Sequence, residues 1–314
     1  MSEAYTLIDA AAAAARWGWL AAVFLVLGAG SYAPFLFHSR THLEATDPDI
    51  ADVLPRRAAG VGFVAGLALL VLTALRLYLQ ARSLQEPSEP VTAELLGAVL
   101  DTDWGTGWKR QAVLTVLAVL SFGAAKTGSR FGWMVASASG GGLGLAAGMT
   151  GHAITNRAGS LGLILDAVHV WAGGLWLGGL AVLLIAGLGA CRRLASARRP
   201  IVVRALVADF SRRALIFGPI TILFGVWMAV QYLGWRWPLE LFQSSYGWTL
   251  AVKLGVMLVI ASLGAYNWRV AQPALGDSAG ERRFRGSALM ELVFGGLLLA
   301  VTAVLVALPF PGEH

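Results

Sequence analysis

The chain has 314 residues, of which 57% are hydrophobic and only 13% are charged. Its mean hydropathy of +0.68 excludes a soluble globular domain. The net charge of +6 is spread over loops that flank apolar stretches, which leaves no basic groove for nucleic acid. This composition predicts an all-α, polytopic membrane helical bundle.

Eight apolar stretches are long enough to cross a bilayer, for which a helix needs about 17 to 25 residues. Sixteen of the 24 Lys and Arg residues fall in the loops after spans one, three, five and seven. Because cytoplasmic loops carry the excess of positive residues, we expect these loops inside and both termini outside. The expected spans are 17–37, 58–79, 111–127, 131–149, 164–189, 214–233, 249–268 and 288–308.

The chain begins with acidic residues, Glu3 and Asp9, where a cleavable signal peptide has a basic segment, so we expect the first span to be retained. After this span, His38 and His42 have the i, i+4 spacing that can chelate a metal on one helical face. Acidic neighbours and Arg40 favour a solvated loop there. A copper release site is the alternative interpretation.

An internal repeat relates the two halves of the chain. Residues 7–23 align with residues 164–180 at an offset of 157 positions. We therefore predict a four-helix unit at 1–150 and a second four-helix unit at 151–314. The two units would be parallel, because each contains an even number of spans. Chance similarity between apolar segments is the alternative interpretation.

The second half carries the best candidates for a binding site. His169 aligns with Ala12 in the repeat, so histidine chemistry belongs to the second half alone. Met149 and His152 are three residues apart, as are Asp166 and His169, and each pair shares one face of a continuous helix. Since a short outer connection joins the pairs, we expect the two histidines to approach each other.

A histidine in hydrocarbon loses hydration, so it is retained for a metal, a proton, a cofactor or a bond between helices. We take His152, His169, Met149 and Asp166 as candidate metal ligands, with Asp166 as an alternative partner that orients His169. Imidazole and thioether ligands favour copper over magnesium or calcium, and they also suit haem iron. Packing for Met149 and helix capping for Asp166 are the structural alternatives.

Other polar groups at membrane depth are few. Glu291 in span eight is the costliest, and we expect it to face the bundle interior and pair with a basic residue or carry a proton. Lys253, near the outer end of span seven, is interpreted as snorkelling to the interface. The single cysteine, Cys191, has no second thiol and is interpreted as a buried small residue.

Four segments of the second half stand out together: GHA at 151–153, LDAVHVWAGGLWLGGL at 165–180, FSRRALIFGPITILFGVWMAVQYL at 210–233 and SYGWTLAVKLGVMLVIASLGAYNWR at 245–269. In these segments and their order, the chain resembles the CopD copper-resistance family of bacterial inner-membrane proteins. The resemblance implies that His152 and His169 occupy the family's histidine positions. It also implies a non-enzymatic membrane protein that carries copper from the periplasm to the cytoplasm with a separate, CopC-like periplasmic partner. The outer side, on which both termini are expected, would then be the periplasm.

Two other functions stay open at the level of sequence. An embedded histidine followed by a Trp-Gly-Gly pattern can ligate haem b, which would make the chain a membrane redox protein. A factor that delivers copper to a respiratory oxidase would share the site but differ in direction and partner. The sequence has no GxxxxGK[ST] motif, which argues against an ATP-driven pump.

Overall fold

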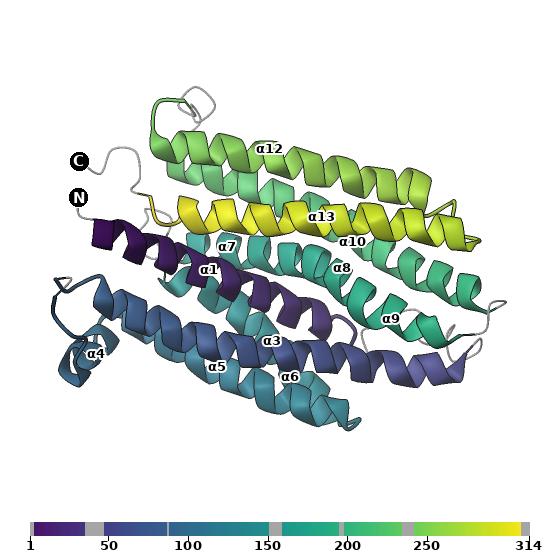
Figure 1. Ribbon diagram of the computed structural model, residues 1–314, viewed down its shortest axis with the longest axis horizontal. Coiled ribbons are helices and arrows are strands. Elements are labelled where there is room, and N and C mark those ends of the chain that lie inside the picture. The colour runs from purple at the N-terminus through teal and green to yellow at the C-terminus, as the bar shows by residue number, and fades with distance from the viewer. Residues whose placement is uncertain are drawn as a thin grey trace.

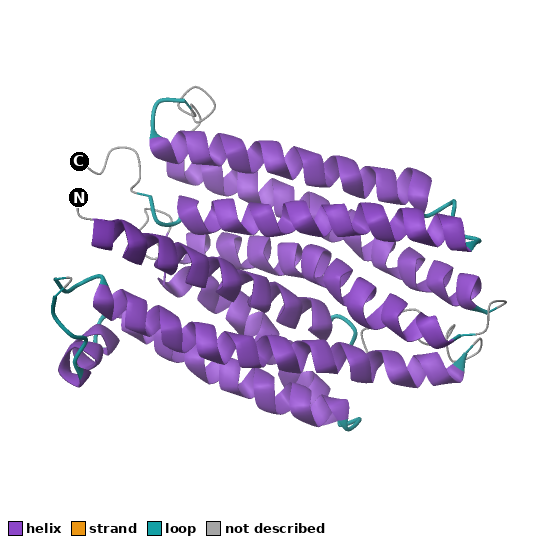
Figure 2. Ribbon diagram, viewed as in Figure 1, coloured by secondary structure: helices purple, strands orange, loops and turns teal. Residues whose placement is uncertain are grey.

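The computed structural model describes residues 3–34, 47–86, 88–150, 159–194, 198–233 and 242–308. Within these ranges the chain is built from helices and contains no β-strand (Figure 2). The long helices run side by side in one elongated bundle (Figure 1). The predicted all-helical, polytopic architecture is confirmed.

The first half forms four long helices and one short one. Side chains of Asp47, Thr102 and Ser129 accept hydrogen bonds from the first turns of α3, α5 and α6, so each helix begins at an N-cap residue. The short helix α4 was not expected, because its apolar stretch is too short for a span. The helices are α1 (Glu3–Gly30), α3 (Pro48–Arg82), α4 (Ala93–Leu100), α5 (Asp103–Lys126) and α6 (Arg130–Ala147).

The second half contains long helices that π-helical segments interrupt. A π-helix carries an extra residue in its turn, is rare, and occurs frequently at functional sites. The elements are α7 (Gly159–Gly173), the π-helix η2 (Gly174–Gly178), α8 (Gly179–Val182), the π-helix η3 (Leu183–Gly187), α9 (Leu188–Ala190), α10 (Arg199–Leu233), α12 (Ser245–Tyr266), the π-helix η5 (Asn267–Ala271) and α13 (Ser278–Leu305).

Six helical segments in the described ranges are long and apolar enough to cross a membrane. They are α1, α3, the continuous helix from α7 to α9, α10, α12 with η5, and α13. Helices α5 and α6 occupy the positions of the two remaining expected spans, so eight spans stay a prediction. The first helix ends at Gly30 and not at residue 37, because a turn follows and Pro34 cannot continue a helix.

Helix α1 begins and α13 ends at the same end of the bundle, which we call the terminal end (Figure 1). Most of the arginines in the described ranges lie at the opposite end, which we call the arginine-rich end. There, α10 begins at Arg199, so much of the expected loop between spans five and six is helical. Asp209 pairs with Arg213 at 2.7 Å, one turn later, which supports this helical extension.

Close contact between backbones fixes α1 against the helix that carries η2. A Cβ atom built at Gly178 would lie 1.8 Å from the carbonyl oxygen of Phe24, and one at Gly28 would lie 2.2 Å from the Gly178 carbonyl carbon. Only glycine allows this approach, which is typical of helix packing in membranes. The contact places Trp176 of η2 in the bundle interior, where it is buried.

Candidate functional site

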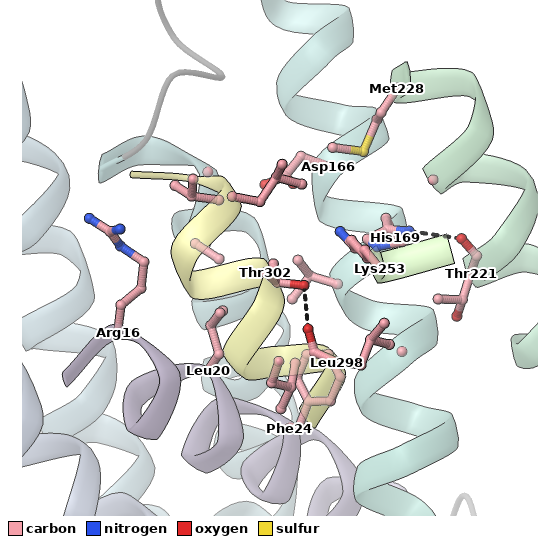
Figure 3. A pocket seen from close by; sticks show the side chains of 18 of the residues that line it. Arg16, Leu20, Phe24, Asp166, His169, Thr221, Met228, Lys253, Leu298 and Thr302 are labelled. Atoms are coloured by element: carbon pink, nitrogen blue, oxygen red, sulfur yellow. Dashed lines mark hydrogen bonds between the residues drawn. The ribbon is translucent and has the colours of Figure 1, made fainter. Parts of the chain in front are cut away.

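A cavity of about 200 Å³ lies toward the terminal end of the bundle, where Arg16 near the start of α1 and Leu305 at the end of α13 line it. Figure 3 shows this cavity from close by. Its walls come from α1, α3, α6, α7, η2, α10, α12 and α13, so both halves of the chain contribute. Most of the lining is apolar. The exceptions are polar or sulfur-containing side chains, namely Arg16, Trp19, Arg76, Thr150, Asp166, His169, Trp176, Thr221, Met228, Tyr246, Lys253, Met257 and Thr302.

His169 is held in a defined orientation on α7. Its Nδ1 atom lies 2.8 Å from the carbonyl oxygen of Thr221 on α10. A carbonyl only accepts, so Nδ1 carries the proton and Nε2 keeps its lone pair. Metal-binding histidines usually show this arrangement, in which the second nitrogen donates to a carbonyl or a carboxylate.

Gly225 makes room for the His169 ring. A Cβ atom at position 225 would lie 3.0 Å from Cε1 and 3.3 Å from Nδ1 of the imidazole. Any larger residue at this position of α10 would press on the ring that bonds to Thr221. The imidazole orientation therefore depends on α10 as well as on α7.

Asp166 lies almost one helical turn before His169 and also lines the cavity (Figure 3). Helix α7 begins at Gly159, so Asp166 lies within the helix and does not cap it. Its carboxylate packs against the small residue Gly148, where a Cβ atom would lie 2.6 Å from Oδ2. The structure thus brings two of the four candidate ligands, Asp166 and His169, to one cavity.

The other two candidate ligands are placed differently. Met149 is not among the residues that line the cavity, and its Sδ atom lies 3.4 Å from Nη1 of Arg110. His152 lies outside the described residues, as do His38 and His42. Within the described part of the chain, no three His, Cys, Asp or Glu residues cluster as a ready-made metal site.

Met228 and Lys253 are among the cavity residues that sequence reasoning did not assign to the site. Met228 of α10 points its thioether toward Asp166 and His169, and Lys253 of α12 lies beside the imidazole (Figure 3). Nothing in the sequence around Met228 indicates a ligand, because a lone methionine in an apolar helix usually only packs against its neighbours. Lys253 faces the cavity and not the membrane surface, so its interpretation as a snorkelling residue was wrong.

Two arginines that line the cavity away from His169 form hydrogen bonds with other residues. Arg76 donates to Gln111 Oε1 and Thr150 Oγ1, both at 2.9 Å, and its guanidinium stacks 4.7 Å from the centre of the Trp19 ring. Arg16 donates to the carbonyl oxygen of Ala303 at 3.0 Å. These bonds hold both guanidinium groups against the residues that they contact in the bundle.

Cys191 directly follows α9 and is fully buried. Burial raises the pKa of its thiol to about 12, with a further contribution from the negative charge of Glu281. Because copper binds the thiolate, Cys191 is a poor ligand. The interpretation as a buried small residue agrees with its burial.

Glu291 forms a separate polar cluster near the middle of α13. Its Oε1 accepts from Trp176 Nε1 at 3.1 Å, and its Oε2 accepts from Asn267 Nδ2 at 2.7 Å. Asn267 Oδ1 in turn accepts from the Ser287 hydroxyl. Glu291 faces the bundle interior as expected, but its partners are neutral donors and not a basic residue.

Comparisons with known proteins identify the family. The family model described as "Copper resistance protein D-like, N-terminal domain" matches residues 7–163, and the one described as "Copper resistance protein D" matches residues 204–305. Asp166 and His169 lie between these two ranges.

One curated relative is "Copper transport protein CutJ" from Bacillus subtilis (strain 168). It is 29% identical over 225 residues, which cover 68% of this chain and 38% of CutJ. The chain thus spans less than two fifths of the length of this relative. No solved structure matches the chain. With one family model covering half of the sequence and a second covering most of α10, α12 and α13, this multi-pass membrane protein belongs to the copper resistance protein D family.

Proposed function

We propose that this chain carries copper across the inner membrane of a bacterium, from the periplasm to the cytoplasm. Family membership supports a role in copper transport. The observation that carries the proposed site is the fixed orientation of His169, whose bond to Thr221 leaves Nε2 free to bind a metal. Copper is the transported substrate and not a resident cofactor.

His169, Asp166 and Met228 would form the core of the outer copper site. They combine an imidazole, a carboxylate and a thioether, and the nitrogen and sulfur donors suit copper. We propose His152 as a fourth ligand, supplied by the connection that precedes α7. Met149 stays a candidate thioether that would have to leave Arg110 to reach the cavity.

The carboxylate of Asp166 and the size of the cavity support an ion as the occupant. Asp166 contributes negative charge that offsets a copper ion, Arg16 and Arg76 are held on other partners, and Lys253 is the positive charge that opposes copper in the cavity. The cavity of about 200 Å³ is smaller than the roughly 300–1,000 Å³ of typical small-molecule sites. A metal ion fits this volume better than a haem macrocycle.

The terminal end would face the periplasm, because the arginine-rich end has the charge of a cytoplasmic surface. A separate CopC-like copper protein would then deliver copper at the mouth of the cavity. Reporter fusions at Ser196 and at the C-terminus test the orientation. We expect a cytoplasmic report from Ser196 and a periplasmic one from the C-terminus, and equal reports from both would contradict it.

Copper uptake into proteoliposomes tests the function. We expect wild-type protein to move copper and His169→Ala to lose most of this uptake. His314→Ala, which removes a histidine far along the chain from the site, should behave as wild type. Thermal unfolding of each variant in detergent controls for misfolding. Uptake that is equal in wild type and His169→Ala would overturn the proposed site.

A further inference from the structure

Glu291 is a carboxyl group buried in a helix that spans the membrane. Only 2% of its surface is exposed, and it lies near the middle of α13, between Ser278 and Leu305. Carboxyl groups at this depth are rare because their charge is costly in hydrocarbon, and they usually take part in ion or proton movement. The outer copper site does not use Glu291.

No cation neutralises Glu291 within the described part of the chain. Helices α1, α8 and α12 and the π-helix η5 pack against α13, and none brings a Lys, Arg or His nitrogen within 4.0 Å of the carboxylate. The cations on these elements have other surroundings: Arg16 bonds Ala303, Lys253 faces the cavity and Arg269 stacks on Trp268. On α13 itself, Arg285 bonds Glu281 and Leu188.

Trp176 connects Glu291 to the outer cavity. The Trp176 side chain lines the cavity and also donates from Nε1 to Glu291. It lies seven residues after His169 on the same continuous helix. A ligand that enters the cavity therefore meets a side chain whose other contact is the buried carboxylate.

Both donors to Glu291 belong to π-helical segments. Trp176 lies in η2 and Asn267 begins η5. The irregular turns of a π-helix re-aim side chains, and they recur at functional sites. A Cβ atom at Gly264 would lie 3.5 Å from Glu291 Oε1 and 3.9 Å from the Trp176 ring, so this glycine leaves room beside the pair.

Protonation would change this cluster. As a carboxylate, Glu291 accepts one N–H bond on each oxygen. When a proton binds one oxygen, that oxygen becomes a hydroxyl and its N–H partner loses a charge-assisted bond. Trp176 is a donor only and can then only weaken its contact, whereas Asn267 can also turn its amide oxygen to accept the new O–H.

We propose that Glu291 reversibly binds a proton and that Trp176 couples this proton to occupancy of the outer cavity. The coupling to copper rests on the proposed function. A proton enters from one aqueous side and leaves to the other while the carboxyl alternates between acid and carboxylate. The proton gradient then supplies the driving force for copper movement.

Infrared difference spectroscopy tests proton binding without copper. Spectra of purified protein at acidic and neutral pH should contain a carboxylic-acid C=O band that Glu291→Gln removes and Trp176→Phe shifts. Glu94→Gln, on an exposed carboxyl, and Trp227→Phe, on an exposed ring, are matched controls that should keep the band in place. A spectrum of Glu291→Gln identical to that of wild type would overturn the proposal.

Copper flux tests the coupling. Wild-type proteoliposomes should take up copper at different rates when the inside is acidic, when the outside is acidic, and when there is no pH gradient. We expect Glu291→Gln to bind copper but to lose this dependence on the pH gradient, with Trp227→Phe as the control. The coupling is overturned if wild-type copper flux does not change with the pH gradient, or if the flux of Glu291→Gln still does. Wild-type protein that binds no copper overturns the proposed function instead, and the infrared band still decides whether Glu291 binds a proton.

Discussion

Gly225→Ala would disturb the position of the His169 ring while leaving the histidine itself unchanged. The new methyl group would lie 3.0 Å from Cε1 and 3.3 Å from Nδ1 of the imidazole. The favourable separation of two carbon atoms is roughly 3.5–4.0 Å. The ring must therefore move, and its 2.8 Å hydrogen bond to the Thr221 carbonyl must lengthen or bend.

The expected loss follows from the role of that bond. Removing a partner that orients a metal-binding histidine typically lowers metal affinity by about 10- to 100-fold. This range equals about 1.4–2.7 kcal/mol of binding free energy. The fold should not suffer in the same way, because alanine is about 1 kcal/mol more favourable than glycine inside a helix.

Competition with a copper chelator measures the affinity, and thermal unfolding reports on stability. Gly255→Ala on α12 is the matched control, since a Cβ atom there meets nothing within 4 Å. We expect wild-type affinity in Gly255→Ala and a loss of at least about tenfold in Gly225→Ala. Equal affinities in the two variants would refute the role assigned to the Thr221 bond.

Three further predictions concern the cavity and its supporting contacts. Met228→Ala should lower copper(I) affinity by about tenfold or more, whereas Met149→Ala should change it little; chelator competition that gives the reverse order would restore Met149 as the thioether ligand. Lys253→Leu removes a positive charge beside the site and should raise copper affinity by roughly tenfold, ~1.4 kcal/mol, in the same assay, and unchanged affinity would show that this charge is screened. Gly178→Ala should lower stability by about 3 kcal/mol, the upper end of the usual cost of overpacking, because its methyl group overlaps a backbone carbonyl that cannot rotate away. Thermal unfolding beside Gly296→Ala, where a Cβ atom meets open space, measures this difference.

The lengths of the apolar stretches made the helical architecture predictable. The long helices lie where the apolar stretches are, because a backbone in hydrocarbon must bond internally. Helix ends were less predictable, since α1 begins at Glu3 and not at 17, and α10 begins at Arg199 and not at 214. Polar residues can continue a helix beyond the membrane, so hydropathy marks the span and not the helix.

Only the part of the candidate site that lies on a single helix could be predicted from the sequence. Asp166 and His169 stood out because polar groups in an apolar helix share a face, and both line the cavity. Met228 and Lys253 reach the cavity from α10 and α12, and no local spacing relates these helices to α7. The hydrogen bond from His169 to Thr221 likewise depends on how two helices cross.

Copper titration of purified wild-type protein and of His169→Ala, followed by copper X-ray absorption and visible spectroscopy, tests the central claim most directly. We expect wild-type protein to bind copper through nitrogen and sulfur ligands without a Soret band, and His169→Ala to lose most of this binding while its unfolding temperature stays close to that of wild type. Copper binding that survives unchanged in His169→Ala, or a Soret band in the wild type, would contradict a copper site built on this histidine.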